Sequence, residues 1–169
     1  MIKMRFPNIV RTILILILIS ACNASGTIEI TREKTEEISS SKTVLLSITT
    51  GADEESVDVA QRLRGALFEG LVSRGVFRQV LQPHETGDYR MDVLLGEVSE
   101  VSQDARIYLG VFAGANTLDA AVSLHEESTN RLVTAFNVSG SSASHPMSSE
   151  HGMEDAIREV VTQIILALE

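Results

Sequence analysis

Residues 117–139 read TLDAAVSLHEESTNRLVTAFNVS, and this stretch decides the fold. Its first part, Thr117 to Glu127, alternates between apolar and polar positions, so one face of a strand carries Leu118, Ala120, Val122 and Leu124. A polar turn follows at 128–130, and the chain returns over Arg131 to Ser139 with Leu132, Phe136 and Val138 on one face. Two such runs joined by a short turn predict an antiparallel β-hairpin with one buried face.

Two amphipathic helices are predicted, one before this hairpin in the sequence and one after it. The second, about Glu150 to Leu168, carries one apolar stripe made of Met153, Ala156, Ile157, Val160, Val161, Ile164, Ile165 and Leu168. The first, about Ser56 to Ser73, carries a stripe made of Val57, Ala60, Leu63, Leu67 and Leu71. Arg74-Gly75 is expected to end it, because glycine readily adopts the left-handed backbone that terminates helices.

Four further runs have the composition of strands, in addition to the two of the hairpin. They are Thr43–Thr49, Val76–Leu81, Tyr89–Val101 with a bulge near Gly96, and a short edge strand at Thr27–Thr31. The main elements then follow the order β-α-β-β-β-β-α. This order predicts an α/β fold, a two-layer sandwich in which two helices cover one face of a mainly antiparallel sheet. The segment from Ser102 to Asn116 begins with polar residues and continues with apolar residues and two glycines, and its sequence indicates neither a helix nor a strand.

The N-terminus has the order of an export signal. Basic residues precede the apolar run Ile13–Ile19, and the small residues Ser20 and Ala21 stand before Cys22, the only cysteine. A seven-residue run is far shorter than the roughly 20 residues that span a bilayer. We therefore expect cleavage between Ala21 and Cys22 rather than a permanent transmembrane helix. A secreted protein with a free thiol is the alternative, and a lone cysteine in an oxidising compartment disfavours it.

Ile19-Ser20-Ala21-Cys22 resembles a bacterial lipobox, the motif whose cysteine receives a diacylglyceryl group and becomes the mature N-terminus. The resemblance implies lipidation of Cys22. In the sorting rule of enteric bacteria, aspartate at the next position retains a lipoprotein at the inner membrane. Asn23 therefore implies an anchor in the outer membrane with the domain in the periplasm. Two or three acyl chains hold a protein on a membrane stably.

Composition and charge limit the partners. Loss of residues 1–21 removes three basic residues and no acidic one, which changes the formal net charge from −9 to −12. Such a charge repels phosphate backbones and disfavours electrostatic binding to anionic lipid. We expect a signal peptide at 1–21, a lipidated cysteine with a polar tether at 22–42, and one α/β periplasmic domain at 43–169.

Arg106, the run Gly110-Val-Phe-Ala-Gly114, the hairpin, Gly140-Ser-Ser and the closing helix together resemble the bacterial lipoprotein family named domain of unknown function 4410. The strand, helix and strand of Thr43 to Leu81 have the order found in that family. Asn130 stands where we expect glycine in the family's hairpin turn, and asparagine tolerates the same positive φ. The resemblance implies a fold similar to periplasmic domains of the curli secretion channel, the amino-terminal TolB domain and penicillin-binding-protein activator lipoproteins. The family has no established activity, so the resemblance implies none for this protein.

Few residues suggest a metal-binding or catalytic site. His145, Glu150 and His151 could bind a metal, but a zinc site needs a third convincing ligand, and solvated loop residues explain them equally well. His125 with Glu126 and Glu127 could act in acid–base catalysis, although the polar face of a strand also accounts for them. Serines abound in 139–149, yet no nucleophile elbow is present. We therefore predict no catalytic residue, no metal, no cofactor and no enzyme.

The glycine-rich segment is the remaining candidate. Gly110 and Gly114 lack the lysine and helix start of a phosphate loop, so close backbone packing is the simpler explanation. The alternative is contact with a membrane or a partner through Ile107, Tyr108, Leu109, Gly110, Val111, Phe112 and Gly114. We also expect an exposed apolar patch around Leu71 to Leu81 with that segment.

The sequence thus predicts a lipid-anchored periplasmic protein-binding or assembly module, with an unknown envelope protein or further copies of itself as partner and no nucleic acid. An oligomeric pore or secretion-assembly subunit of the outer membrane is the first alternative. A small envelope enzyme is the second.

Overall fold

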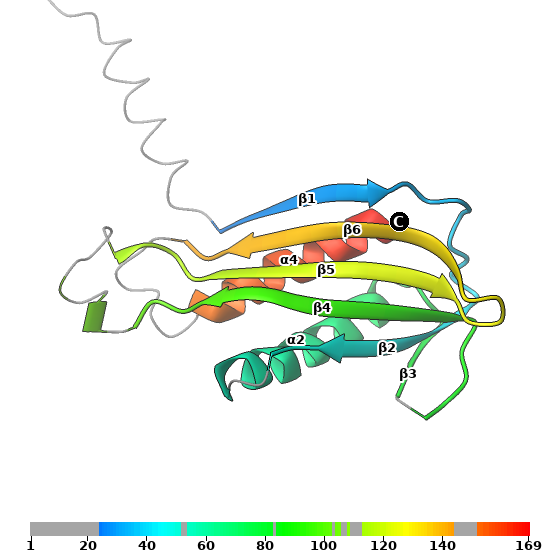
Figure 1. Ribbon diagram of the computed structural model, residues 1–169, viewed down its shortest axis with the longest axis horizontal. Helices are drawn as coiled ribbons and strands as arrows, with labels where there is room; N and C mark the ends of the chain where they lie inside the picture. The colour runs from blue at the N-terminus through cyan, green and yellow to red at the C-terminus, as the bar shows by residue number, and fades with distance from the viewer. Residues whose placement is uncertain are drawn as a thin grey trace, which may run out of the picture.

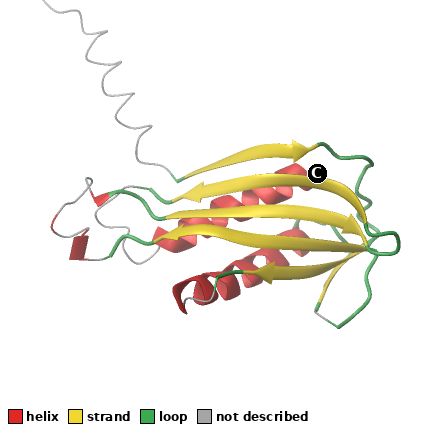
Figure 2. Cartoon of the chain, viewed as in Figure 1, coloured by secondary structure: helices red, strands yellow, loops and turns green. Residues whose placement is uncertain are grey.

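The computed structural model describes residues 24–51, 54–82, 84–102, 104–105, 108, 113–143 and 152–169 (Figures 1 and 2). Six strands form one sheet in the order β1-β6-β5-β4-β2-β3. The elements are β1 Ser25–Arg32, β2 Thr43–Thr49, α2 Glu54–Ser73, β3 Gln79–Leu81, β4 Tyr89–Ser99, β5 Thr117–Glu126, β6 Arg131–Ser141 and α4 Gly152–Leu168.

Both helices lie on the same face of the sheet, as Figure 2 shows. Helix α2 contacts β2, β3 and β4, whereas α4 contacts β5, β6, β1 and α2. The pairs β1–β6, β6–β5 and β5–β4 are antiparallel, and β2 runs parallel to both β3 and β4. The predicted α/β class, with two helices on one face of a mainly antiparallel sheet, is confirmed.

The β5–β6 hairpin forms as predicted, with one difference of register. Leu118, Ala120, Val122 and Leu124 are all buried. On β6, however, Val133 is fully buried, and the expected core residue Leu132 lies opposite His125 instead. The pairing shifts between Leu124 and His125, which leaves Val133 as an extra, bulged residue. The prediction for Leu132 is therefore wrong. The extra residue shifts the alternation along β6 by one position, so that Leu132 lies on the opposite face of the sheet from the one expected.

Helix α4 buries every residue of its predicted stripe. On α2 the stripe consists of Val59, Leu63, Leu67 and Leu71, and the prediction that placed Val57 in the core is wrong, since its side chain is exposed. The four-residue spacing from Val59 to Leu71 puts these residues on one face of the helix, and this face packs on the sheet. The predicted end of the helix is confirmed. Gly75 has φ +67°, and the N–H groups of Gly75 and Val76 donate to the carbonyls of Val72 and Leu71, which is a Schellman motif.

The strand expected over Val76–Leu81 is shorter than predicted, because only Gln79–Leu81 pairs with β2. Val76 and Phe77 are still buried, with the ring of Phe77 against that of Tyr89. The exposed apolar patch expected around Leu71 to Leu81 is thus wrong for most of its residues. The expected irregularity in β4 is confirmed: its register with β5 shifts between Leu95 and Val98, around Gly96.

The expected edge strand at Thr27–Thr31 is confirmed as part of β1, which pairs with β6 along its whole length. The chain beyond it also contacts the domain, since Thr35 and Glu36 bind near the β5–β6 turn. Much of the segment expected as a tether over 22–42 therefore belongs to the folded domain. β1 begins at Ser25, beside Thr117 and Ser141, and this end of the sheet is called the anchor end below. The opposite end, with the β5–β6 turn, is the turn end.

Candidate functional site

The structure describes only part of the predicted site. Ala21, Cys22, Ile107, Leu109, Gly110, Val111 and Phe112 lie outside the described residues, as do His145, Glu150 and His151. Tyr108 is described, and its side chain is 84% exposed. Gly114 has φ +91°, a backbone conformation that suits glycine in a tight connection. Both belong to the β4–β5 connection, which lies at the anchor end of the sheet (Figure 1).

A network of charged side chains fixes the turn end. The Arg131 guanidinium donates to Glu36, at 2.8 Å, and to Thr35. It also pairs with Glu126, and the Thr129 hydroxyl donates to the same carboxylate at 2.6 Å. The Thr129 hydrogen bond, followed by the Arg131 charge, lowers the pKa of Glu126. These contacts fasten the β5–β6 turn to the chain that leaves β1.

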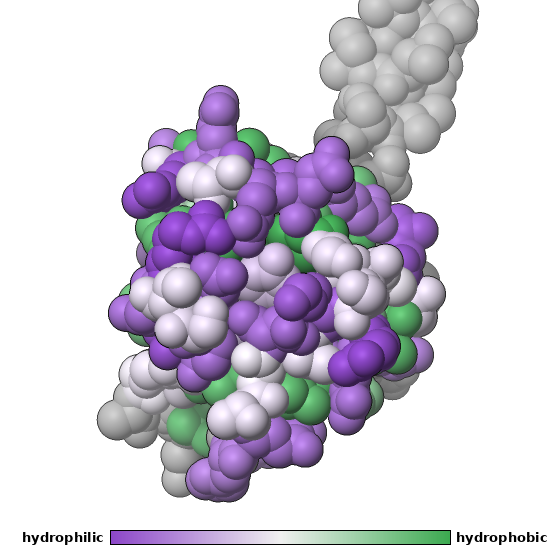
Figure 3. Space-filling view, turned by 90° about the vertical axis from the view of Figure 1, so that its right-hand side faces the viewer, coloured by the Kyte–Doolittle hydropathy of each residue, from purple (hydrophilic) through white to green (hydrophobic). Residues whose placement is uncertain are grey.

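Arg90 forms a second network on the open face of the sheet. Its Nε donates to Asp92 at 2.9 Å, and Nη2 donates to Asn130 at the same distance. Nη1 lies 3.5 Å from Glu127. Asn130 itself has φ +53°, the positive value that the sequence led us to expect. The charged side chains around the turn are therefore paired with one another. Figure 3 views the molecule from this end and shows mainly hydrophilic side chains with smaller hydrophobic patches between them.

The predicted histidine–carboxylate group is divided by these networks. Glu126 is held by Arg131 and Thr129, whereas Glu127 lies beside Arg90. His125 lies opposite Arg90 on the neighbouring strand, and its Nδ1 atom is buried with no hydrogen-bond partner among the described residues. Among all the residues that the structure describes, no three His, Cys, Asp or Glu side chains are placed to hold a metal ion. Glu126 and Glu127 thus have different partners, and of the two only Glu127 contacts Arg90, the residue opposite His125.

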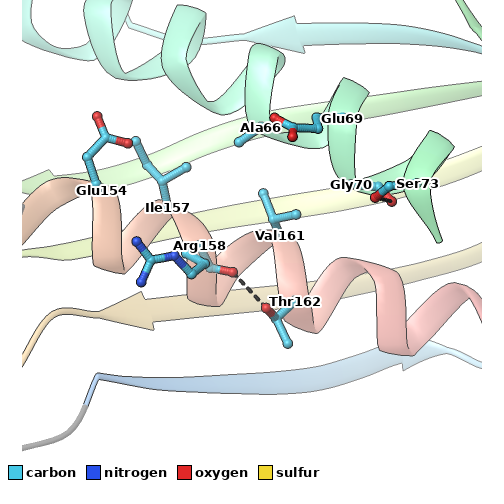
Figure 4. Close-up of a pocket in the computed structure, with 9 residues that line it drawn as sticks. All are labelled: Ala66, Glu69, Gly70, Ser73, Glu154, Ile157, Arg158, Val161 and Thr162. Atoms are coloured by element: carbon cyan, nitrogen blue, oxygen red, sulfur yellow. Dashed lines mark hydrogen bonds between the residues drawn. The ribbon is translucent and has the colours of Figure 1, made fainter.

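A groove of about 310 Å³ runs between the two helices (Figure 4). Ala66 and Gly70 of α2 face Ile157 and Val161 of α4 across it. A Cβ on Gly70 would lie 2.9 Å from both Val161 and Ile165, so the glycine allows the close approach of the helices. Glu154, one of the lining residues, forms a 2.7 Å ion pair with Arg62. The groove is shallow and partly apolar. Its lining Arg158 pairs with Asp155, whereas Glu69 takes part in no ion pair within the described residues.

Several large apolar side chains are exposed on the surface and belong to neither charged network. Large hydrophobic side chains are exposed at Ile28 and Ile30 of β1, at Val57, Phe68 and Val72 of α2, at Leu166 of α4, at Leu94 of β4 and at Tyr108. The sequence analysis predicted exposure for only two of these, Tyr108 and, within the patch expected over Leu71 to Leu81, Val72. Phe68 could also have been recognised, because with Val57 and Val72 it forms a second apolar stripe on the same helix. Among the described helices, none has the length and apolar character needed to cross a membrane.

Known structures share this fold. Two crystal structures of the PelC dodecamer from Paraburkholderia phytofirmans match, with TM-scores of 0.61 and 0.59 and identities of 15% and 12%. Each match covers 85% of this chain and 96% of the PelC chain. A Xanthomonas campestris protein of the family DUF330 matches with a TM-score of 0.51 and 12% identity, over 83% of this chain and 91% of its own. At these identities the similarity shows the fold alone.

No curated protein sequence matches the chain. The model of the family described as domain of unknown function (DUF4410) matches residues 27–146, which begin within β1 and extend past the end of β6, and this confirms the expected resemblance. The chain belongs to this family.

Proposed function

We propose that this protein is a lipid-anchored module of the bacterial cell envelope that works through protein contacts and assembles with copies of itself. The observation that carries the proposal is the exposure of large apolar side chains on two separate elements, β1 and α2. Exposed apolar patches on a domain with a well-filled core mark contact surfaces. The charged clusters of the described residues, by contrast, are paired within the domain.

The proposed anchor is Cys22 in the outer membrane, with the domain in the periplasm. The mature chain would carry a net charge of −12, so attraction to anionic lipid does not supply the membrane contact. β1 begins at Ser25, three residues after Cys22, and three residues span at most about 11 Å. The anchor end of the sheet would therefore lie close to the membrane.

Self-association is supported by the shared fold of PelC, which forms a dodecamer. It is tested by co-expressing two full-length forms that carry different C-terminal tags. We expect capture of one tag from detergent extracts to recover the other. A sample prepared by mixing separately expressed forms after extraction controls for association in detergent. If neither tag ever recovers the other, self-association is refuted.

An oligomeric pore or secretion-assembly subunit is the second candidate, and the exposure of Tyr108 at the anchor end favours it. Tyrosine suits a membrane interface, where its ring meets apolar groups and its hydroxyl meets water. A pore-forming protein would release dye from phosphatidylethanolamine-rich vesicles, and Tyr108→Ser would slow the release. No release by the wild-type protein would exclude a pore and leave the assembly module unaffected.

A further inference from the structure

The exposed apolar residues of β1 and α2 lie on opposite lateral edges of the domain. β1 is the outermost strand on one side of the sheet, beside α4. Helix α2 covers the other side, above β4, β2 and β3. The β1 edge is defined by Ile28 and Ile30, and the α2 edge by Val57, Phe68 and Val72.

The side chains of the α2 edge point away from the rest of the domain. Ala66 and Gly70 of this helix face α4. Phe68 and Val72 stand two positions after them, and residues two apart lie roughly on opposite sides of a helix. Their side chains are 42% and 43% exposed. The α2 edge is thus a stripe on the outer flank of the helix, separate from the stripe that faces the sheet.

The β1 edge combines apolar side chains with an unpaired strand. Within the described residues, β1 pairs only with β6, and the backbone N–H and C=O groups on its other side pair with no described strand. Edge strands are usually protected by shortness, proline, charged side chains or bulges. β1 has eight residues and no proline, and its protection is limited to two charged side chains, Glu29 and Arg32, and an irregularity after Ile30. Beside Ile30, a hollow of about 320 Å³ is lined by Phe136, Thr134 and Ala167, with Glu33 and Lys34 also in its lining. An apolar side chain of a partner could enter it.

Charge does not oppose the meeting of these two edges. Arg64 on the flank of α2 and Arg78 just before β3 take part in no ion pair within the described residues. On the β1 edge, two carboxylates, Glu29 and Glu33, and two cations, Arg32 and Lys34, likewise take part in no ion pair there. The α2 edge therefore has an excess of positive charge, whereas the charges of the β1 edge balance. Its two carboxylates can pair with cations of the α2 edge, and like-charge repulsion between the edges is avoided.

The anchor restricts how copies can be arranged. If each copy is held at the start of β1, all copies have the same end toward the membrane. Their strands then run away from the membrane, and the β1 and α2 edges face sideways. Copies in one orientation that meet through two different surfaces form a heterologous contact, which closes into a ring when the rotation allows.

We propose that the β1 edge of one copy binds the α2 edge of the next, with Ile28 and Ile30 against Phe68 and Val72. The occupant of each edge is thus a second copy of this chain. The inference rests on the proposed self-association and names the surfaces that produce it.

Two full-length variants test it: Ile30→Arg on the β1 edge and Phe68→Arg on the α2 edge. Each is expected to be monomeric by light scattering in detergent. Mixed in equal amounts, they retain one intact pair of edges, the α2 edge of the first and the β1 edge of the second. The mixture is therefore expected to double the protein mass to a dimer and to go no further.

Leu94→Arg, on the open face of the sheet, is the matched control and should keep the wild-type mass, because Leu94 is equally exposed but lies on neither edge. If either variant fails to fold by circular dichroism, Ile28→Arg or Val72→Arg replaces it. Single variants that keep the wild-type mass would overturn the proposed edges and leave self-association standing. The proposed edges would also be overturned if only one of the two variants lost the wild-type mass, or if the mixture of the two stayed monomeric. A monomeric wild-type protein would instead refute the proposed function.

Discussion

Asp88, directly before β4, accepts two hydrogen bonds from Thr43, the first residue of β2. Its Oδ2 lies 2.8 Å from the Thr43 backbone nitrogen and 2.9 Å from the Thr43 hydroxyl oxygen. The Asp88 N–H donates back to the same hydroxyl, and Lys42 pairs with Oδ1 at 2.9 Å. These contacts join two parallel strands whose connection passes through α2 and β3. The Thr43 N–H, followed by Lys42, lowers the pKa of Asp88 to about 2.

This contact predicts an acid-sensitive stability. Because the pKa of Asp88 is lower in the folded state, its carboxylate stabilises the fold above about pH 4, and the contribution is lost as the pH falls toward about 2. Asp88→Asn is expected to lower the free energy of unfolding by about 1 to 2 kcal/mol at pH 7. Urea denaturation at several pH values should show the difference from wild type shrinking below pH 4. A difference of equal size at pH 7 and pH 2.5 would contradict the assignment.

A second prediction concerns the close approach of β6 and α4. A Cβ added to Gly140 would overlap the backbone oxygen of Ala156, which cannot move without shifting the helix. Gly140→Ala is therefore expected to destabilise the domain by at least about 1 to 3 kcal/mol, the usual cost of overpacking.

Gly65 supplies the matched control for this substitution. It lies inside α2, and a Cβ added there would meet no atom within 4 Å, so Gly65→Ala should raise stability by about 0.5 to 1 kcal/mol through helix propensity. Thermal melting of both variants checks the pair. Equal effects of the same sign would show that the contact of Gly140 with α4 is not the cause.

The long amphipathic segments could be predicted from the sequence, because one buried face determines each of them. The α4 stripe from Met153 to Leu168 and the inner face of β5 are as expected. The prediction for Val57 is wrong because α2 has two apolar stripes, and the spacing inside the helix does not say which one meets the sheet. Contact with the sheet selects the stripe that begins at Val59.

Other features depend on contacts between distant residues. The bulge at Val133 reverses the facing of Leu132, and it follows from pairing with β5 rather than from local sequence. The edge strand predicted at Thr27–Thr31 forms, but its pairing with β6 runs from Ser25 to Arg32 and so draws more of the predicted tether into the sheet. The exposed edges could not be derived at all without the strand order, because only the order shows that β1 and α2 lie on opposite sides.

The proposed lipid anchor at Cys22 leads to a third prediction. Cys22→Ser should move the protein from the membrane fraction to the soluble periplasmic fraction, because the variant cannot be acylated and its net charge disfavours binding to anionic lipid. Fractionation followed by immunoblotting measures this. A variant that stays in the membrane fraction after a carbonate wash would refute the anchor.

The residue after the cysteine gives a fourth prediction. Asn23→Asp should move the protein from outer-membrane to inner-membrane fractions if the sorting rule of enteric bacteria applies. Separation of the two membranes on a sucrose gradient tests it, with Asn23→Gln as the control that should stay in the outer membrane. The same distribution for both variants would show that position 23 does not direct sorting.

The protein mass of the detergent-extracted full-length chain, measured by size-exclusion chromatography with multi-angle light scattering, tests the account most directly. Assembly through the β1 and α2 edges predicts a single species whose mass, after correction for detergent, is a multiple of the 18.4 kDa chain less its signal peptide. A single copy at every concentration tested would contradict it.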